Sequence, residues 1–230
     1  MTFEFQEPKI NIQVAHEPSI LMDEGLVDPN VETGKRKIPV TYLGEEYNRI
    51  MRESQREWVC IIDSDIFFAM RAFYPVLQNA IRATQDQNVG LISCYTNETK
   101  CSEQRAPRVL EYVKEKTGSK KYMHRVTLRQ WQEFGNWIWK ENKYGLKQSK
   151  NKRLGGFLML TSKTAWQRAG GFSTIPSQWG IDQDYCSRID KAGMNIVIAT
   201  GLFVAHLRDR KIGSPIDGEY TSRELHRYKK

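Results

Sequence analysis

Apolar and polar residues follow two different periods along the 230-residue chain. Short apolar runs predict strands, and apolar positions three and four residues apart predict helices. The predicted strands are Lys9 to Ala15, Lys37 to Tyr42, Glu57 to Ile62, Val89 to Tyr95, Gly156 to Leu160 and Asn195 to Ala199. The predicted helices are Glu45 to Ser54, Tyr74 to Thr84, Val126 to Asn142, a helix capped by Ser162 that runs to Arg168, and Asp182 to Ala192. This alternation predicts an α/β fold, with a mostly parallel sheet and flanking helices. Residues Glu17 to Lys35 have weak periodicity and are expected to form a long loop.

Two carboxylates, Asp63 and Asp65, follow the most apolar of these strands and are separated only by Ser64. A buried strand does not tolerate unpaired charge, so both acids should lie where the strand leaves the core. Ligands of parallel sheets collect at the carboxyl ends of the strands. Carboxylate oxygens at such a place suit Mg²⁺ or Mn²⁺, which would normally carry a diphosphate.

An Asp-x-Asp pair is by itself a weak sign of a metal site. Asp and Ser are ordinary turn residues after a strand. A metal-dependent phosphatase can also begin its site with such a pair, although Phe67 stands where those enzymes often have Thr or Val, and no downstream Lys motif is evident.

Composition and charge narrow the class of protein. With 40% hydrophobic residues the chain should fold, no apolar run is long enough for a membrane span, and the N-terminus lacks a cationic leader. We therefore expect a cytoplasmic protein and, if it belongs to a phage, one that acts in the host cytoplasm. Cys60 and Cys186 lie among apolar residues and should be buried free thiols. Asn97-Glu98-Thr99 matches a glycosylation acceptor, which we interpret as accidental.

Positive charge is concentrated in one segment. Between Lys114 and Arg153 the chain has twelve Lys and Arg against three acids, a balance of +9 in a chain whose net charge is +8. The same segment contains Trp131, Phe134, Trp137, Trp139 and Tyr144. The positive charge can raise the local concentration of a polyanion, and the aromatic rings can stack on bases or sugars. Alternatively, the aromatic residues face the core of an amphipathic helix and the lysines are solvated.

Four ordered motifs occupy the second half: Gly155-Gly156-Phe157, Gly170-Gly171-Phe172, Trp179-Gly180-Ile181-Asp182 and Val204-Ala205-His206. Together with the acidic pair, their order and spacing resemble the glycosyltransferases with the GT-A fold, a Rossmann-like nucleotide-diphospho-sugar transferase fold. The resemblance covers roughly residues 38–210 and is greatest to the inverting "family two" type and to galactosyltransferases with a Trp-Gly-x-Gly-Glu-Asp segment. The phage enzymes that glycosylate hydroxymethylated pyrimidines in DNA are similar to the chain in size and charge.

The resemblance implies a role for each matching residue. Asp65, Asp63 and His206 match metal ligands, and Asp182 matches the general base. The residues implied in nucleotide-sugar binding are His16, Asn48, Asp63, Ser64, Gly155, Gly156, Arg208 and Arg210. Those proposed for the acceptor side are Trp179, Asp184, Trp139, Lys150, Lys152 and Arg153. An imidazole ligand favours Mn²⁺ over Mg²⁺, and an acid in the first turn of a helix is stabilised as an anion.

The chain is accordingly expected to be one GT-A domain. Residues 1–100 would form the nucleotide and metal half, residues 101–210 the acceptor half, and residues 211–230 a basic tail. The donor is expected to be a UDP-linked nucleotide sugar, and the acceptor a polyanion, with a hydroxymethylated base in DNA as the first candidate. Ile181 replaces the family's acidic residue before the base, so acceptor choice cannot be carried over. A surface glycan, a lipid-linked sugar, and a non-enzymatic nucleic-acid-binding role remain as alternatives.

Overall fold

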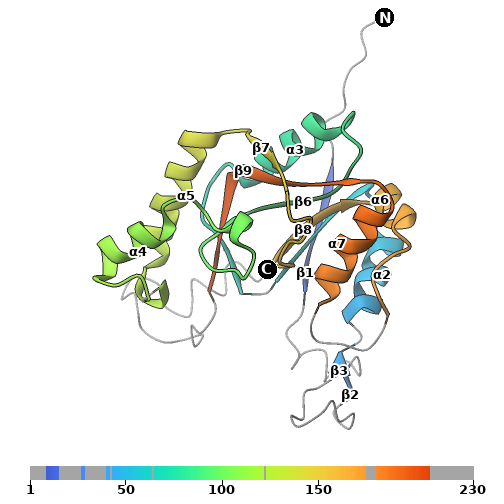
Figure 1. Ribbon diagram of the computed structural model, residues 1–230, viewed down its shortest axis with the longest axis horizontal. Helices are drawn as coiled ribbons and strands as arrows, with labels where there is room; N and C mark the ends of the chain where they lie inside the picture. Colours follow the sequence, from blue (N-terminus) through green and yellow to red (C-terminus); the bar gives the residue numbers. More distant parts are fainter. Residues whose placement is uncertain are drawn as a thin grey trace, which may run out of the picture.

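A computed structural model describes residues 9–15, 27–28, 40–41, 43–63, 65–121, 123–174 and 180–207 (Figure 1). Its centre is a seven-stranded sheet, in which six strands follow the order β1-β4-β8-β6-β9-β5 and β7 pairs with β9. These strands are β1 (Ile10–Ala15), β4 (Trp58–Asp63), β5 (Ile66–Phe68), β6 (Val89–Thr96), β7 (Leu146–Gln148), β8 (Leu158–Ser162) and β9 (Asn195–His206). Two short strands, β2 (Val27–Asp28) and β3 (Val40–Thr41), form a separate antiparallel pair.

The sheet is mixed, but its four longest strands run in one direction. β1 is parallel to β4 and β6 is parallel to β9, while β8 lies between β4 and β6 and is antiparallel to both. Consequently β1, β4, β6 and β9 share a direction and end at the same edge of the sheet. β8 begins at that edge, and the short strands β5 and β7 run against β9. The predicted α/β class and the common direction of its main strands are confirmed.

Helices cover both faces of this sheet (Figure 1). They are α2 (Leu43–Glu53), α3 (Phe73–Thr84), α4 (Val109–Thr117), α5 (Leu128–Asn142), α6 (Lys163–Arg168) and α7 (Ile181–Lys191). Alternate residues of β4 enter two separate cores: Val59 and Ile61 pack with residues of α2, α5 and α7, whereas Cys60 and Ile62 pack with α3. Burial on both faces explains why this strand reads as an unbroken apolar run.

The helix ends follow their sequence signals. Thr127 caps α5 in a reciprocal capping box with Gln130, and the hydroxyl of Ser162 accepts the backbone N–H of Ala165, as predicted for the start of α6. Gly193, after the end of α7, has φ +71°, a left-handed conformation that suits glycine.

Several boundaries differ from the prediction. β8 begins at Leu158 instead of Gly156, because residues 156–157 form a turn. β9 continues past Ala199 to His206, because Gly201 lies within the strand and does not end it. Val27–Asp28, inside the predicted loop, forms β2. The short strands β5 and β7 were not predicted, since three-residue strands carry too little periodicity, and the helix α4 was not predicted either.

Gly201 lies against the backbone of residue 143, and this contact predicts a large effect on stability. A Cβ atom at Gly201 would lie 1.5 Å from the carbonyl oxygen of Lys143. Because backbone cannot move aside as a flexible side chain can, we expect Gly201→Ala to lower the free energy of unfolding by about 3 kcal/mol or more. Urea denaturation measures this loss. Gly118, whose Cβ position is open, is the control: Gly118→Asn should cost less than about 1 kcal/mol, since Asn tolerates left-handed backbone.

The four cysteines are free, and three of them are buried, as expected for Cys60 and Cys186. Burial raises the pKa of the Cys60 and Cys94 thiols and raises that of Cys186 to about 12. A raised thiol pKa leaves almost no reactive thiolate at pH 8. We therefore expect iodoacetamide to label only Cys101 in the folded protein and all four cysteines in guanidinium chloride, as counted by intact mass. Labelling of two or more thiols in the folded state would contradict this burial.

Among the described residues, none of the helices has the length and apolar character needed to cross a membrane.

Candidate metal centre and neighbouring acid

Candidate site residues gather at one edge of the sheet because of the strand directions. Asp63 ends β4, His206 ends β9, and Asn97 directly follows the end of β6. β8 runs the other way, so Gly155 and Gly156, which precede it, reach the same edge. Segments that are far apart in the sequence therefore meet where parallel strands end, which is the usual position of a ligand site in an α/β sheet.

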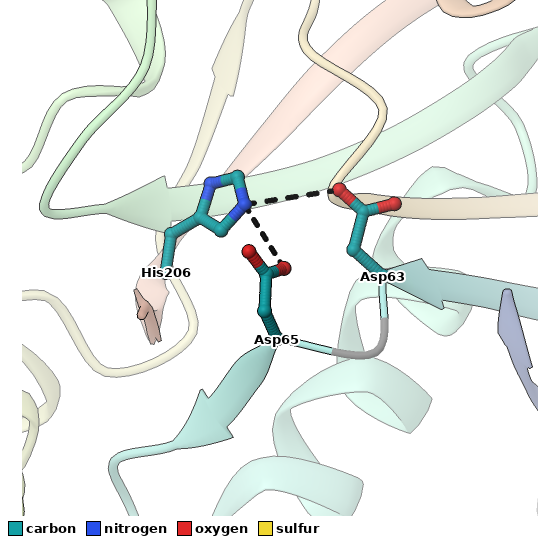
Figure 2. Close-up of side chains that lie close together, drawn as sticks. All are labelled: Asp63, Asp65 and His206. Atoms are coloured by element: carbon teal, nitrogen blue, oxygen red, sulfur yellow. Dashed lines mark ion pairs between the residues drawn. The ribbon is translucent and has the colours of Figure 1, made fainter. Parts of the chain in front are cut away.

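Asp63, Asp65 and His206 form a compact group that can hold a metal ion (Figure 2). One ligand atom from each residue lies within 4.8 Å of the others. His206 Nε2 is 3.0 Å from an oxygen of Asp65 and 3.9 Å from an oxygen of Asp63. The imidazole is 4% exposed, whereas each carboxylate is 36% exposed, so the group opens to solvent on its acidic side.

Backbone pairing sets these positions. β5 and β9 are antiparallel with Ile66 opposite His206, and the backbone N–H of Leu207 donates to the carbonyl oxygen of Asp65 at 2.9 Å. On the other side, the backbone N–H of Asp63 donates to the carbonyl oxygen of Phe157 at 3.1 Å. Asp63 thus ends β4 and Asp65 directly precedes β5, and both side chains face one imidazole.

Asp182 lies next to this group. It is the second residue of α7, in its first turn as predicted, and it is half-buried. One carboxylate oxygen accepts the backbone N–H of Gly156 at 2.9 Å, and the other accepts that of Gln183 at 2.8 Å. Gly156 donates to Asp182 and its neighbour Phe157 accepts from Asp63, so two consecutive residues join the acid on α7 to the metal group.

A buried phenol lies close to both acids. Burial raises the pKa of Tyr47 on α2, and the negative charges of Asp63 and then Asp182 raise it further. Both carboxylates therefore act electrostatically on one buried hydroxyl. Tyr47 also contacts the ring of Phe172, which stacks on Tyr185 at 4.0 Å. The second Gly-Gly-Phe motif, which ends at Phe172, therefore packs beside Tyr47.

Asn48, predicted to approach the nucleotide, has a clear structural contact. Its amide donates to the carbonyl oxygen of Phe172 at 3.0 Å and accepts from the backbone N–H of Phe172 and the indole N–H of Trp166. It therefore fixes the loop after α6. The nucleotide contact of Asn48 stays a prediction.

The other predicted residues are distributed as follows. Gly155 is held by Gln104, Asp184 pairs with Arg188 on the same helix, and Lys152 pairs with Asp190. Ile181 is buried, so the position that is acidic in the resembling enzymes belongs to the core here. His16, Ser64, Trp179, Arg208, Arg210 and the tail 211–230 lie outside the described residues.

The basic segment divides into a buried aromatic part and an exposed cationic part. Trp131 and Phe134 are core residues, and Trp137 and Trp139 are partly buried against the core. Tyr144, 49% exposed, is the most accessible of the five rings. Eleven of the twelve Lys and Arg residues are exposed. The core interpretation therefore holds for Trp131 and Phe134, and the positive charge remains available at the surface.

Two buried side chains next to the site, Asn97 and Gln104, were not predicted. Asn97 is 2% exposed, with its amide bonded to the backbone of His206, so this amide is not accessible for glycosylation in the folded protein. Gln104 is fully buried and bonded to Gly155. Polar residues in a loop after a strand carry no sequence signal that separates such contacts from solvation.

The chain also has a structural likeness to a known protein. No family model matches the chain, and no curated protein matches it. Among solved structures, the chain is similar to the mannosyltransferase PcManGT from Pyrobaculum calidifontis, in complex with GDP-Man and Mn²⁺, with 19% identity and a TM-score of 0.43. The match covers 78% of this chain and 39% of that chain, so this chain spans about two fifths of the mannosyltransferase.

Proposed function

We propose that the chain is a metal-dependent glycosyltransferase that moves a sugar from a nucleoside-diphosphate donor to an acceptor hydroxyl. The observation that carries this proposal is the pair of backbone contacts at Gly156 and Phe157, which joins Asp182 to the Asp63, Asp65 and His206 group. A divalent-cation site and a separate carboxylate on one rim supply the two functions that such a transfer needs. Three of the four sequence motifs that resemble GT-A glycosyltransferases supply a residue to this region: Gly156, Asp182 and His206.

The residues fit a divalent cation. Two carboxylates and one imidazole converge, the imidazole directs Nε2 at both acids, and the acids are open to solvent (Figure 2). This mixed oxygen and nitrogen set suits Mn²⁺ better than Mg²⁺. Asp63, Asp65 and His206 would hold the ion, which would neutralise charge on the departing diphosphate.

Asp182 would act as the general base. The backbone N–H groups of Gly156 and Gln183 donate to the Asp182 carboxylate and fix its orientation. Its oxygens keep further lone pairs that can accept a proton. The acceptor hydroxyl oxygen forms a bond to the anomeric carbon of the donor sugar while the bond from that carbon to the phosphate oxygen breaks. The hydroxyl proton goes to Asp182, and the nucleoside diphosphate leaves with the electron pair. Attack from the face opposite the diphosphate would invert the anomeric configuration.

Donor binding is the first test. Thermal unfolding would be followed with Mn²⁺ and a panel of UDP-, GDP- and dTDP-linked sugars. A nucleotide sugar at 100 times its Kd should stabilise the protein by about 2.7 kcal/mol, which raises the Tm of a chain this long by about 5 to 10 °C. No shift with any donor, in the presence of Mn²⁺, would overturn the glycosyltransferase proposal.

For the acceptor we propose a polyanion, with a hydroxymethylated base in DNA as the first candidate. The support is the charge alone: eleven exposed Lys and Arg residues between 114 and 153, of which Lys140, Lys143, Lys150 and Arg153 follow or end α5 and lead to Gly155. Phosphate contacts of this kind give salt-dependent affinity. A base inside a duplex would have to be flipped out to reach Asp182.

Hydroxymethylated DNA, plain DNA and a lipid-linked sugar in vesicles would be compared as acceptors with the best donor. Faster nucleoside diphosphate release with hydroxymethylated DNA alone, accompanied by a mass increase of one sugar, is the expected result. If neither DNA changes the rate of nucleoside diphosphate release, the DNA acceptor is excluded. Transfer to the lipid-linked sugar in vesicles would establish a membrane-associated glycan acceptor instead.

A further inference from the structure

Residues 97–104, which follow β6, contact both halves of the candidate site through two buried primary amides. At one end, the Asn97 side chain bonds to the main chain of His206; at the other, the Gln104 side chain bonds to the main chain of Gly155. Asn97 and Gln104 are 2% and 0% exposed. Each side-chain amide donates to the backbone carbonyl and accepts from the backbone N–H of a single residue. It therefore makes the same pair of hydrogen bonds that a neighbouring strand would make.

Asn97 extends the β6–β9 pairing beyond the last residue of β6. The regular register ends with Thr96 opposite Val204. The Asn97 amide then accepts the backbone N–H of His206 at 2.6 Å and donates to the carbonyl oxygen of His206 at 3.1 Å. His206 Nδ1 is buried without a hydrogen-bond partner among the described residues, so no acceptor orients the ring from the Nδ1 side, and only Nε2 faces carboxylates. The backbone held by Asn97, together with the neighbouring Phe157 ring, sets the position of Nε2.

Gln104 performs the corresponding task on the other side. Its carbonyl oxygen accepts the backbone N–H of Gly155 at 2.6 Å, and its NH₂ group donates to the Gly155 carbonyl at 3.2 Å and to the hydroxyl of Ser93 at 2.7 Å. Ser93 in turn donates to the carbonyl of Leu158 in β8. Gly155 is thereby fixed to the sheet, and the next N–H along the chain, that of Gly156, is the one that orients the Asp182 carboxylate.

Further contacts tie the same segment to the loop before Gly155. The Glu103 carboxylate accepts the hydroxyl of Ser149 at 2.7 Å and the backbone N–H groups of Lys150 and Asn151. The thiol of Cys101 donates to the carbonyl oxygen of Arg153 at 3.0 Å. The loop from 149 to 155 is therefore held at several points by one short segment.

We propose that residues 97–104 are a positioning bracket, in which Asn97 sets the metal affinity of His206 and Gln104 sets the orientation of Asp182 through Gly155 and Gly156. The metal and base assignments rest on the proposed function. The bracket predicts a separation of effects: loss of the Asn97 amide weakens metal binding, whereas loss of the Gln104 amide slows the transfer step and leaves metal binding intact.

Three variants of matched size test this separation. Asn97→Leu and Gln104→Met remove each amide with little change in volume. Thr161→Val is the control, because it removes a buried hydroxyl bonded to Gly90 and Tyr185 at the far end of β8, away from the site. The Mn²⁺ Kd would be measured from the free-ion electron paramagnetic resonance signal, and amide hydrogen exchange would be measured for peptides that contain Gly155 and Gly156.

We expect Asn97→Leu to raise the Mn²⁺ Kd at least about 10-fold, since outer partners of ligating histidines carry effects of this size. Gln104→Met should leave the Mn²⁺ Kd within about twofold, accelerate exchange at Gly155 and Gly156, and lower kcat about 10-fold with the donor KM nearly unchanged. Thr161→Val should change none of these. Equal shifts in all three variants, or no shift in Asn97→Leu and Gln104→Met, would overturn the bracket.

A further measurement uses only the wild-type protein, so it does not require any variant to fold. The backbone amides of His206 and Gly155 should exchange as slowly as those of β4, and fast exchange at both would refute the bracket. Failure of the proposed function gives a different pattern: with no turnover for any donor, the Mn²⁺ titration and the exchange rates still decide whether Asn97 and Gln104 act as stated.

Discussion

Asp182→Asn is expected to lower kcat by about 100- to 10,000-fold, the range that a positioned general base contributes. Asparagine keeps the size of the side chain, and its carbonyl can still accept the Gly156 N–H. It cannot take a proton from an attacking hydroxyl. Mn²⁺ affinity and donor-induced thermal stabilisation should therefore stay close to wild type while nucleoside diphosphate release falls.

Asp190→Asn is the matched control for this variant. Asp190 lies eight residues further along the same helix and pairs with Lys152, so its replacement removes a carboxylate from α7 without touching Gly156. We expect its kcat to stay within about threefold of wild type. An Asp182→Asn enzyme that turns over normally, or an Asp190→Asn enzyme that is equally slow, would contradict the assignment of Asp182 as base.

The second large effect concerns the metal. Asp65→Asn removes the charge 3.0 Å from His206 Nε2 and should weaken Mn²⁺ binding by more than about 100-fold, since loss of even an outer partner costs about 10- to 100-fold. The thermal stabilisation that Mn²⁺ gives the wild-type protein should disappear, as should metal-dependent turnover. Differential scanning fluorimetry across a Mn²⁺ titration measures the first, and a donor assay the second.

Asp86→Asn, in the exposed turn after α3, controls for a general loss of negative charge. It should retain the wild-type Mn²⁺ response. If Asp65→Asn and wild type show the same Mn²⁺ dependence, the ion is held elsewhere and the Asp63, Asp65 and His206 group is not the metal centre.

Much of the architecture could be predicted from the hydrophobic periodicity of the chain and from the places of polar residues at the ends of predicted strands and helices. The apolar run of β4 indicated a strand buried on both faces, and the acids after it could only lie at its mouth. The direction of β1, β4, β6 and β9 follows from their helical connections, which explains why Asp63 and His206, 143 positions apart in the sequence, meet. Asp182 in the first turn of a helix followed from the periodicity of the residues after it.

Contacts that depend on individual loops could not be predicted. β5 is only three residues long, yet its register opposite β9 brings Asp65 beside His206. Asn97 and Gln104 look like ordinary loop residues in the sequence, and their importance appears only when their amides meet the backbone of distant segments. The sequence left two interpretations open for Trp131, stacking on a base or sugar and packing in the core, and the structure places its ring in the core.

Mn²⁺-dependent release of nucleoside diphosphate from a nucleotide sugar tests the central claim most directly. The protein would be incubated with its stabilising donor and either Mn²⁺ or EDTA, with Asp182→Asn in parallel. We predict steady release by wild type with Mn²⁺, none above background with EDTA, and about 100-fold or more slower release by Asp182→Asn. Release that is unaffected by EDTA and by Asp182→Asn, or its absence with every donor and acceptor, would contradict a metal-dependent glycosyltransferase.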